Sequence, residues 1–319
     1  MTRKALLLGI DAYEEDQLRL SAATADVREL EKALVLAGFA PAEVQAVVGG
    51  PGAYLSTANL RKRIKAVLDD ARRGDELVIY FSGHGIEQSG RRLLLPQDFD
   101  ASQPADPTQL IQDTELYQLA RSEACRADAV IFIIDACRND APPAPSLLAK
   151  AAPSPSPAGP GPDAETPSIA FLFSCAAGEV SHATDGEEAM SCFTRALCEA
   201  LTADDELSTL GELRDAVQTR LDAALRPLAK HQSATQGELQ CTGRGGDPLA
   251  LMLKDNPATR LRQRIAQPLG AAHQPAGPLV VGKLLRRVQQ RPRRLPRAAG
   301  AVASRRHRRG GVPTLLGFL

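Results

Sequence analysis

Short apolar runs alternate with amphipathic segments along the chain as far as residue 225. A continuous apolar run bounded by polar residues is typical of a strand buried on both faces, whereas apolar residues three and four apart indicate a helix with one buried face. Their alternation predicts an α/β fold with a mostly parallel central sheet covered by helices on both faces. The expected strands are 5–10, 44–48, 76–81, 129–134 and 169–173, and the expected helices are 25–34, 59–73, 113–121, 192–201 and 210–225.

Two segments interrupt this pattern. Residues 141–167 are rich in proline, which lacks the amide hydrogen that helices and central strands use, so we expect an exposed linker there. In residues 256–319 the apolar periodicity fades and Arg, Pro, Gly and Ala dominate, which predicts disorder. The expected organisation is a folded domain over 1–255 that contains the linker, followed by a separate tail over 256–319.

The charge of the chain is divided between these two parts. The totals are 38 Lys+Arg and 38 Asp+Glu, but every acidic residue lies at or before Asp255. Residues 1–255 carry 24 basic residues and a net charge of −14, whereas 256–319 carries 14 basic residues and no acidic one. The tail is therefore a candidate for binding nucleic acid or an anionic surface, for inhibiting the domain, or for no folded role.

The composition is that of a globular protein, with 44% hydrophobic and 24% charged residues. No apolar run approaches the roughly 20 residues of a membrane span, and the first residues lack the pattern of a signal peptide. We therefore expect a cytoplasmic protein with reduced thiols. The cysteines are Cys125, Cys137, Cys175, Cys192, Cys198 and Cys241, and their spacing to each other and to histidine is not that of a zinc site.

Two expected strands are followed by residues that can carry chemistry. Ser-Gly-His-Gly, which contains His84, follows 76–81, and Asp-Ala-Cys-Arg, which contains Cys137, follows 129–134. If the strands are parallel neighbours, both side chains emerge at one edge of the sheet, where an imidazole can take the proton of a thiol. The amides of Gly85 and Cys137 are then candidate donors to an oxyanion. Separately, His84 and Cys137 would be explained as ordinary structural residues; together they predict a Cys-His dyad.

These two motifs resemble those of the caspase family of cysteine peptidases, in which the His precedes the Cys by about 50 residues. Here the separation is 53 residues. Further matches follow in the same order, and the resemblance covers roughly residues 4–253. It implies a caspase-like α/β/α sandwich and a cysteine endopeptidase with protein or peptide substrates. The further matches are Leu-Pro-Gln-Asp at 95–98, Ser-Cys-Ala-Ala-Gly-Glu at 174–179 and Phe-Thr-Arg-Ala-Leu at 193–197.

The residue two positions before the nucleophile sets an expectation for specificity. Animal caspases have Gln there and cleave after Asp, whereas this chain has Asp135, which would repel an acidic P1 side chain and pair with a basic one. The resemblance is thus to the metacaspases and orthocaspases of bacteria and plants, which cleave after Arg or Lys. It implies a second pocket carboxylate at Asp26 and a pocket hydroxyl at Ser82. An alternative for Asp26 is a favourable interaction with a helix N-terminus.

The resemblance also bears on maturation and activation. The linker lies where many relatives are cut during maturation, and its one basic residue, Lys150, is the expected site of self-cleavage; an uncut flexible loop is the alternative. Substrate is expected to bind as an extended strand against 178–183. No recruitment domain precedes the first strand, so activation would use a partner protein, a ligand or self-processing.

The acids that follow the His motif bear on metal dependence. Many metacaspases bind calcium through acids that follow the His motif, but Gln-Asp-Thr-Glu at 112–115 supplies only one of the expected pair of aspartates, so we expect no required metal and no cofactor. The competing function is a catalytically silent caspase-like interaction module whose basic tail binds nucleic acid or a membrane. The presence of both His84 and Cys137 favours the enzyme.

Overall fold

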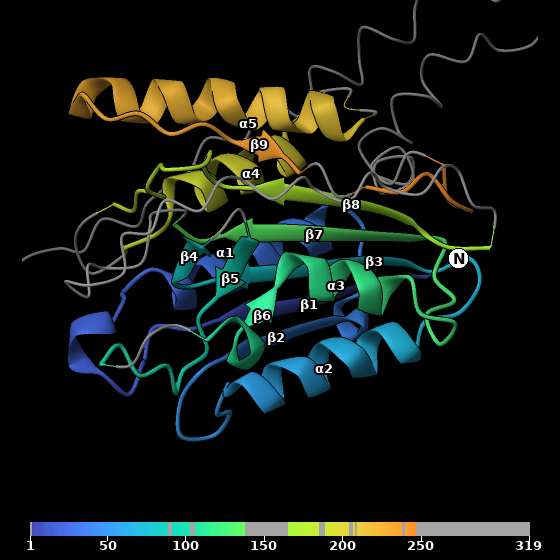
Figure 1. Ribbon diagram of the computed structural model, residues 1–319. Coiled ribbons are helices and arrows are strands. Elements are labelled where there is room, and N and C mark those ends of the chain that lie inside the picture. The colour runs from blue at the N-terminus through green and yellow to red at the C-terminus, as the bar shows by residue number, and fades with distance from the viewer. Residues whose placement is uncertain are drawn as a thin grey trace, which may run out of the picture. The chain divides into compact units, whose positions relative to one another are not determined.

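The central sheet of the described chain has five parallel strands and one antiparallel edge strand, β9, in the order β2-β1-β3-β7-β8-β9 (Figure 1). The computed structural model describes residues 2–88, 91–102, 106–137, 165–184, 189–203, 207, 209–237 and 240–246. Every residue of β3 and β7 is buried, as expected for apolar strands between two layers. The strands are β1 (Arg3–Gly9), β2 (Val44–Val48), β3 (Glu76–Ser82), β7 (Ala129–Asp135), β8 (Ser168–Phe173) and β9 (Thr235–Gln236).

Helices cover both faces of this sheet, and each face has its own hydrophobic cluster. One cluster joins the sheet to α1, α4 and α5, and the other joins it to α2 and α3. The architecture is therefore the expected α/β fold with a mostly parallel sheet between helical layers. The helices are α1 (Ala23–Leu36), α2 (Thr57–Asp69), α3 (Asp113–Ala120), α4 (Cys192–Thr202) and α5 (Leu210–Leu225), with short 3-10 helices at Asp16–Leu18, Pro41–Glu43, Pro107–Gln109 and Arg226–Leu228.

All ten expected elements are present, and capping side chains fix several of their ends. Thr209 and Glu212 form a reciprocal capping box at the start of α5, and the Ser191 hydroxyl accepts a hydrogen bond from the amide of Thr194 at the start of α4. The expected bounds of α2 were wrong, because the helix begins after the capping residue Ser56 and ends four residues before position 73. The backbone then turns at Gly74, which has a φ of 87°.

A second, antiparallel sheet follows β3 and was not predicted. It contains β4 (Gly85–Gln88), β5 (Arg91–Leu94) and β6 (Ile111–Gln112) in the order β4-β5-β6. These strands have two to four residues each and include polar positions, so they give almost no alternating signal. Because β4 begins at Gly85, this sheet fixes the chain directly after His84.

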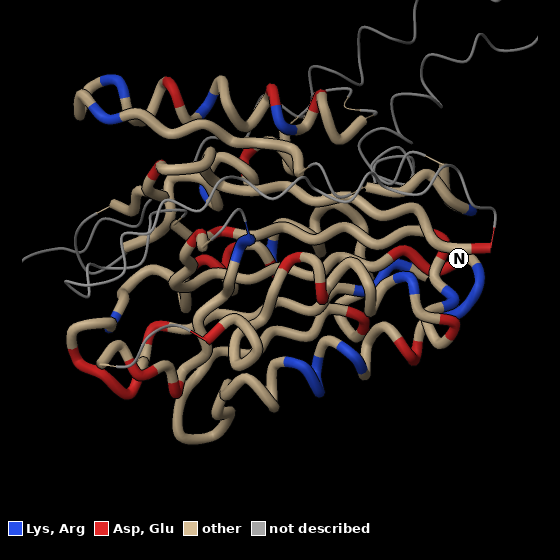
Figure 2. Tube along the Cα trace, in the orientation of Figure 1, with Lys and Arg blue, Asp and Glu red and all other residues tan. Residues whose placement is uncertain are grey.

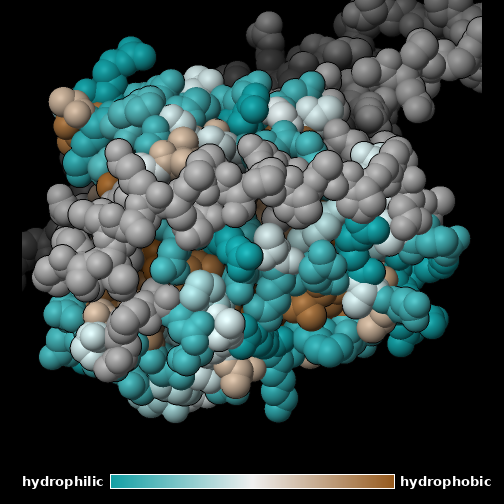
Figure 3. Space-filling model, viewed as in Figure 1, coloured by the Kyte–Doolittle hydropathy of each residue, from teal (hydrophilic) through white to brown (hydrophobic). Residues whose placement is uncertain are grey.

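The surface of the described residues is mostly hydrophilic on the face shown in Figure 3. Figure 2 shows basic residues along α2 and acidic residues in the loop that follows β1, which contains Glu14, Glu15 and Asp16. Among the described residues, no helix is long and apolar enough to cross a membrane. All six cysteines are free thiols, as expected.

Several expectations concern residues outside the described part of the chain. Most of the linker, including Lys150, and the whole tail from 256 to 319 are not described. The expected domain boundary at Asp255 also lies outside it. The linker, the self-cleavage site and the disorder of the tail therefore stay predictions.

Candidate active site

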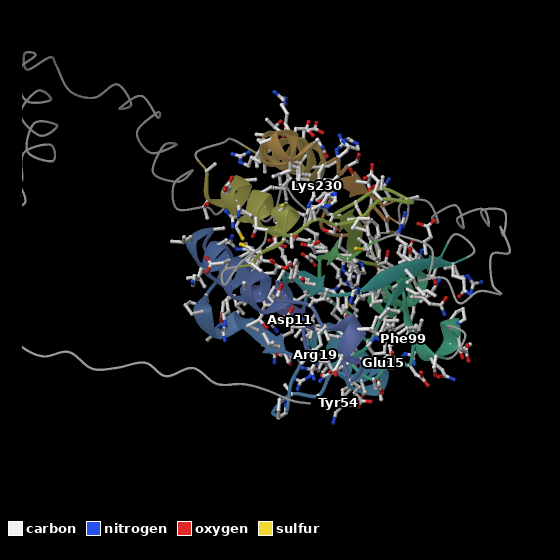
Figure 4. The ribbon with its side chains drawn as sticks, turned by 90° about the vertical axis from the view of Figure 1, so that its left-hand side faces the viewer. Asp11, Glu15, Arg19, Tyr54, Phe99 and Lys230 are labelled. Carbon is white, nitrogen blue, oxygen red and sulfur yellow. The ribbon has the colours of Figure 1, made fainter. Side chains whose placement is uncertain are left out.

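Strands β3 and β7 deliver His84 and Cys137 to the same edge of the sheet. The strands are parallel neighbours, and Ser82 is paired in register with Asp135. His84 and Cys137 each follow this pair by two residues, so both leave the sheet at the same height. Figure 4 looks onto the side of the molecule where β7 and β8 end, with Lys230 labelled in the upper part of the view and Asp11 and Arg19 in the lower part.

The loop between β1 and α1 holds the imidazole of His84. Nε2 of His84 lies 2.8 Å from the carbonyl oxygen of Leu18, and the His84 amide donates to the Tyr13 hydroxyl at 2.7 Å. Because a carbonyl only accepts, Nε2 carries the proton and Nδ1 of the neutral ring is the free acceptor. Burial lowers the pKa of His84, which favours that neutral ring at neutral pH.

The same loop is anchored to the start of α1 through Asp11. One carboxylate oxygen of Asp11 accepts from the amide of Ala23 at 2.9 Å, and the other accepts from the amide of Thr24 at 2.7 Å. These are amides of the first helical turn, which lack partners within the helix. Asp11, Tyr13 and Leu18 were missed by the sequence analysis, because a backbone carbonyl and a loop conformation leave no motif.

Cys137 follows β7 in a half-buried position. Burial raises the pKa of the Cys137 thiol, and its Sγ lies 4.0 Å from the carbonyl oxygen of Ser181. Among the contacts of the described residues, no hydrogen bond joins Cys137 to His84. The resting pair is therefore a neutral thiol and a neutral imidazole rather than a preformed ion pair.

Gly85 lies closely against the backbone of the nucleophile. A Cβ atom at Gly85 would stand 2.9 Å from the carbonyl oxygen of Cys137 and 2.9 Å from Cβ of Ala136, so a larger residue does not fit. The Leu95 amide donates to the His84 carbonyl at 3.0 Å, and antiparallel pairs alternate between bonded and non-bonded positions. The next pair, Gly85 and Leu94, is then non-bonded, which leaves the Gly85 amide outside the ladder with β5.

Asp26, Ser82 and Asp135, the three expected pocket residues, lie together under this edge. Asp26 is 1% exposed, and its carboxylate accepts from the Ser82 hydroxyl at 2.7 Å and from the Ser191 amide at 2.8 Å. Burial, followed by repulsion from the nearby Asp135 carboxylate, raises the pKa of Asp26 to about 8. Asp26 lies in the first turn of α1, but its partners are in β3 and before α4.

Asp135 is held by two hydroxyl groups. The Ser181 hydroxyl donates to one carboxylate oxygen at 2.7 Å, and the Thr194 hydroxyl donates to the other at 2.6 Å. The Tyr80 hydroxyl lies 2.6 Å from that of Thr194 and extends the network into the sheet. Ser181, Ser191 and Thr194 were missed as site residues; Thr194 belongs to the motif at 193–197, but the motif itself assigns it no role.

The expected absence of a required metal stays a prediction. Among the described residues, no group of three or more His, Cys, Asp or Glu side chains is arranged to hold a metal ion. Asp113, the single aspartate of the expected calcium pair, forms an ion pair with Arg92 at 3.1 Å.

Comparison with known proteins identifies the family and supports the fold. The model of the caspase domain of the peptidase C14 family matches residues 2–242. A crystal structure of a protein from Geobacter sulfurreducens superposes with a TM-score of 0.52 at 18% identity and covers 81% of this chain and 98% of its own. The crystal structure of caspase-1 from Spodoptera frugiperda gives 0.51 at 17% identity and covers 77% and 90%. No curated protein sequence matches the chain.

A histidine and a cysteine at neighbouring strand ends are the residue types that nucleophilic catalysis by a thiol uses. The chain belongs to the caspase-domain family of peptidase C14, a family of cysteine peptidases. The two solved structures, at less than a fifth identity, support the same fold.

Proposed function

We propose that this protein is a cysteine endopeptidase that cleaves proteins after Arg or Lys, with Cys137 as nucleophile and His84 as general base. The observation that carries the proposal is the register of β3 and β7, which places both residues two positions beyond the Ser82–Asp135 pair. The family membership and the position of the Leu18 carbonyl at Nε2 of His84 support it.

The reaction begins from the neutral pair. Nδ1 of His84 takes the thiol proton as Sγ of Cys137 attacks the scissile carbonyl carbon, and the positive charge on the ring is stabilised by the Leu18 carbonyl at Nε2. The amides of Gly85 and Cys137 donate to the oxyanion. The ring then protonates the leaving amine, and water hydrolyses the thioester with the ring again acting as base.

The buried carboxylates supply the preference for a basic P1 side chain. Among the described residues, the hydrogen-bond donors to Asp26 and Asp135 are hydroxyl and amide groups, so a substrate guanidinium or ammonium would supply the cation that this part of the chain does not. Ser82 bridges Asp26 to the end of β3 and is the pocket hydroxyl. The substrate backbone would extend along 178–183, next to the Ser181 carbonyl.

Peptide cleavage tests this proposal directly. Fluorogenic peptides with Arg, Lys or Asp at P1 are compared on the wild type, Cys137→Ala and the matched control Cys125→Ala, whose thiol is buried in the cluster with α2 and α3. The wild type and Cys125→Ala should cleave the Arg and Lys peptides, and Cys137→Ala should lose roughly 10⁴-fold or more. Cleavage by Cys137→Ala at the wild-type rate, or a preference for Asp, would contradict the proposal.

Self-cleavage after Lys150 is part of the proposal, and it concerns residues outside the described chain. Intact-mass spectra of the wild type should contain a fragment ending at Lys150 that Cys137→Ala lacks. The same fragment in both proteins would assign the cut to another protease. An activating partner and binding of nucleic acid or an anionic surface by the tail remain predictions. We place the reaction in the cytoplasm, where free thiols persist.

A further inference from the structure

Gln232, which no sequence motif singled out, holds both ends of the loop that follows β8. Its side chain is fully buried, and its amide nitrogen donates to the Ser174 carbonyl at 2.9 Å and to the Ser181 hydroxyl at 3.2 Å. Its amide oxygen accepts from the backbone amide of His182 at 2.9 Å. One side chain therefore closes the loop between Ser174 and His182, which contains most of the segment 178–183 that is expected to bind substrate.

The Ser181 hydroxyl connects Gln232 to the pocket carboxylate. A hydroxyl has one hydrogen to donate, and here its oxygen accepts from Gln232 while its hydrogen is directed to Asp135 at 2.7 Å. The carbonyl of the same serine is the group 4.0 Å from Sγ of Cys137. Gln232 thus fixes Ser181, which lies next to both the candidate nucleophile and the carboxylate.

The segment that carries Gln232 is itself held at two places. The Gln218 side chain, in α5, donates to the Gln232 carbonyl at 3.0 Å and accepts from the Ala234 amide at 2.8 Å. Ser233 donates to the Glu179 carboxylate from its amide at 2.7 Å and from its hydroxyl at 3.0 Å. The amide of Gln232 is therefore preorganised rather than free to follow the loop.

We propose that Gln232 is a positioning residue that sets affinity for a basic P1 side chain by orienting the Ser181 hydroxyl toward Asp135. The inference rests on the proposed peptidase function. It assigns the selectivity of the pocket in part to a residue that touches neither the substrate nor the dyad. The physical reason is that the hydroxyl donor holds the Asp135 carboxylate in place, and the Gln232 amide prevents that hydroxyl from turning away.

The test compares Gln232→Met, Ser181→Ala and the double variant with the control Gln236→Met in β9. Gln232→Met keeps the shape of the side chain and removes its polar contacts, whereas Ser181→Ala removes only the hydroxyl. KM and kcat for an Arg-P1 peptide and the thermal midpoint are measured for each. We expect Gln232→Met and Ser181→Ala to raise KM about tenfold with kcat within about threefold of wild type. The KM of the double variant should equal that of either single variant, because both substitutions break the same hydrogen-bond chain from residue 232 through residue 181 to Asp135.

Gln232→Glu supplies a second readout that does not depend on Gln232→Met folding. The new carboxyl group can donate to Ser181 only when protonated, so KM should approach the wild-type value as pH falls and rise as pH rises. Unchanged KM in Ser181→Ala or in folded Gln232→Met, or a wild-type pH dependence in Gln232→Glu, would overturn the inference. Wild-type protein that cleaves no basic-P1 peptide would instead refute the proposed function.

Discussion

Two pairs of buried aspartates in the described chain differ in their partners. Asp75, before β3, and Asp113, at the start of α3, are each 6% exposed and form ion pairs with Lys4 at 3.3 Å and Arg92 at 3.1 Å. Asp26 and Asp135 are buried more deeply, at 1% and 4%, yet no described Lys or Arg forms an ion pair with either. The first pair is compensated within the fold, and the second is not.

This difference supports the proposal that Asp26 and Asp135 are pocket acids, whereas Asp75 and Asp113 are structural ones. Two desolvated carboxylates without a cation are unfavourable for folding when both are ionised, and buried acids with raised pKa values cluster at functional sites. The ends of β3 and β7 show where the apolar core gives way to these polar groups. Phe81 and Ile134 belong to the apolar cluster with α2 and α3, whereas the next residues, Ser82 and Asp135, face α1 and α4.

Among substitutions of these four aspartates, Asp135→Asn should have the largest effect on peptide cleavage. Loss of the charge leaves the P1 cation without its partner, so kcat/KM for an Arg-P1 peptide should fall about 100-fold or more. The thermal midpoint should not fall, because a desolvated charge is removed. Steady-state kinetics and thermal unfolding measure both. Retained selectivity for Arg over a neutral P1 residue would show that Asp135 is not the pocket acid.

Asp26→Asn should produce an intermediate and pH-dependent effect. The pKa of Asp26 is about 8, so this group is neutral below that pH and charged above it. In the wild type, KM for an Arg-P1 peptide should therefore decrease as pH rises from 7 to 9, and this decrease should vanish in Asp26→Asn. Kinetics across that range provide the measurement. The same pH dependence in both proteins would contradict the role given to Asp26.

The raised pKa of Asp26 also predicts how the stability of the folded protein depends on pH. Between the ordinary pKa of an aspartate and about 8, the folded protein keeps a proton on Asp26 that the unfolded chain releases. Stability from this group is thus present at acid pH and is lost as pH rises through that window. Asp26→Asn should be more stable than the wild type at pH 8 and above, with a difference that narrows at lower pH.

Asp113→Asn should produce the smallest effect on activity. The substitution leaves Arg92, which also lies over the Phe173 ring, without its buried anion and should lower the free energy of unfolding by about 1–3 kcal/mol. Urea unfolding measures this loss. The ratio of the cleavage rates of the Arg-P1 and Asp-P1 peptides should not change, because Asp113 lies outside the proposed pocket. A changed ratio would contradict the distinction between the two pairs of aspartates.

The sequence was sufficient for the five parallel strands of the main sheet, the helices and the two motifs at the strand ends. Continuous apolar runs identify the strands, and the position of His84 and Cys137 directly after two of them identifies the candidate site. The short strands β4, β5, β6 and β9 were missed, since two to four residues carry too little periodicity. Their pairing is decided by long-range contacts that a local pattern does not contain.

The pocket was predictable only as far as family motifs reach. Asp26 and Asp135 were expected from the resemblance, and the structure brings them together with Ser82. The contributions of the Leu18 carbonyl and of Gln232 are set by backbone conformation and by residues far apart in sequence. Neither has a signature in residue type or spacing.

Covalent labelling tests the central claim most directly. A peptidyl-arginine chloromethyl ketone and the matching aspartate reagent are incubated with the protein, and the modified residue is located by peptide mapping. We predict a single adduct on Cys137, formed much faster with the arginine reagent and slowed in Asp135→Asn. An adduct on another cysteine, or equal rates with both reagents, would contradict the account.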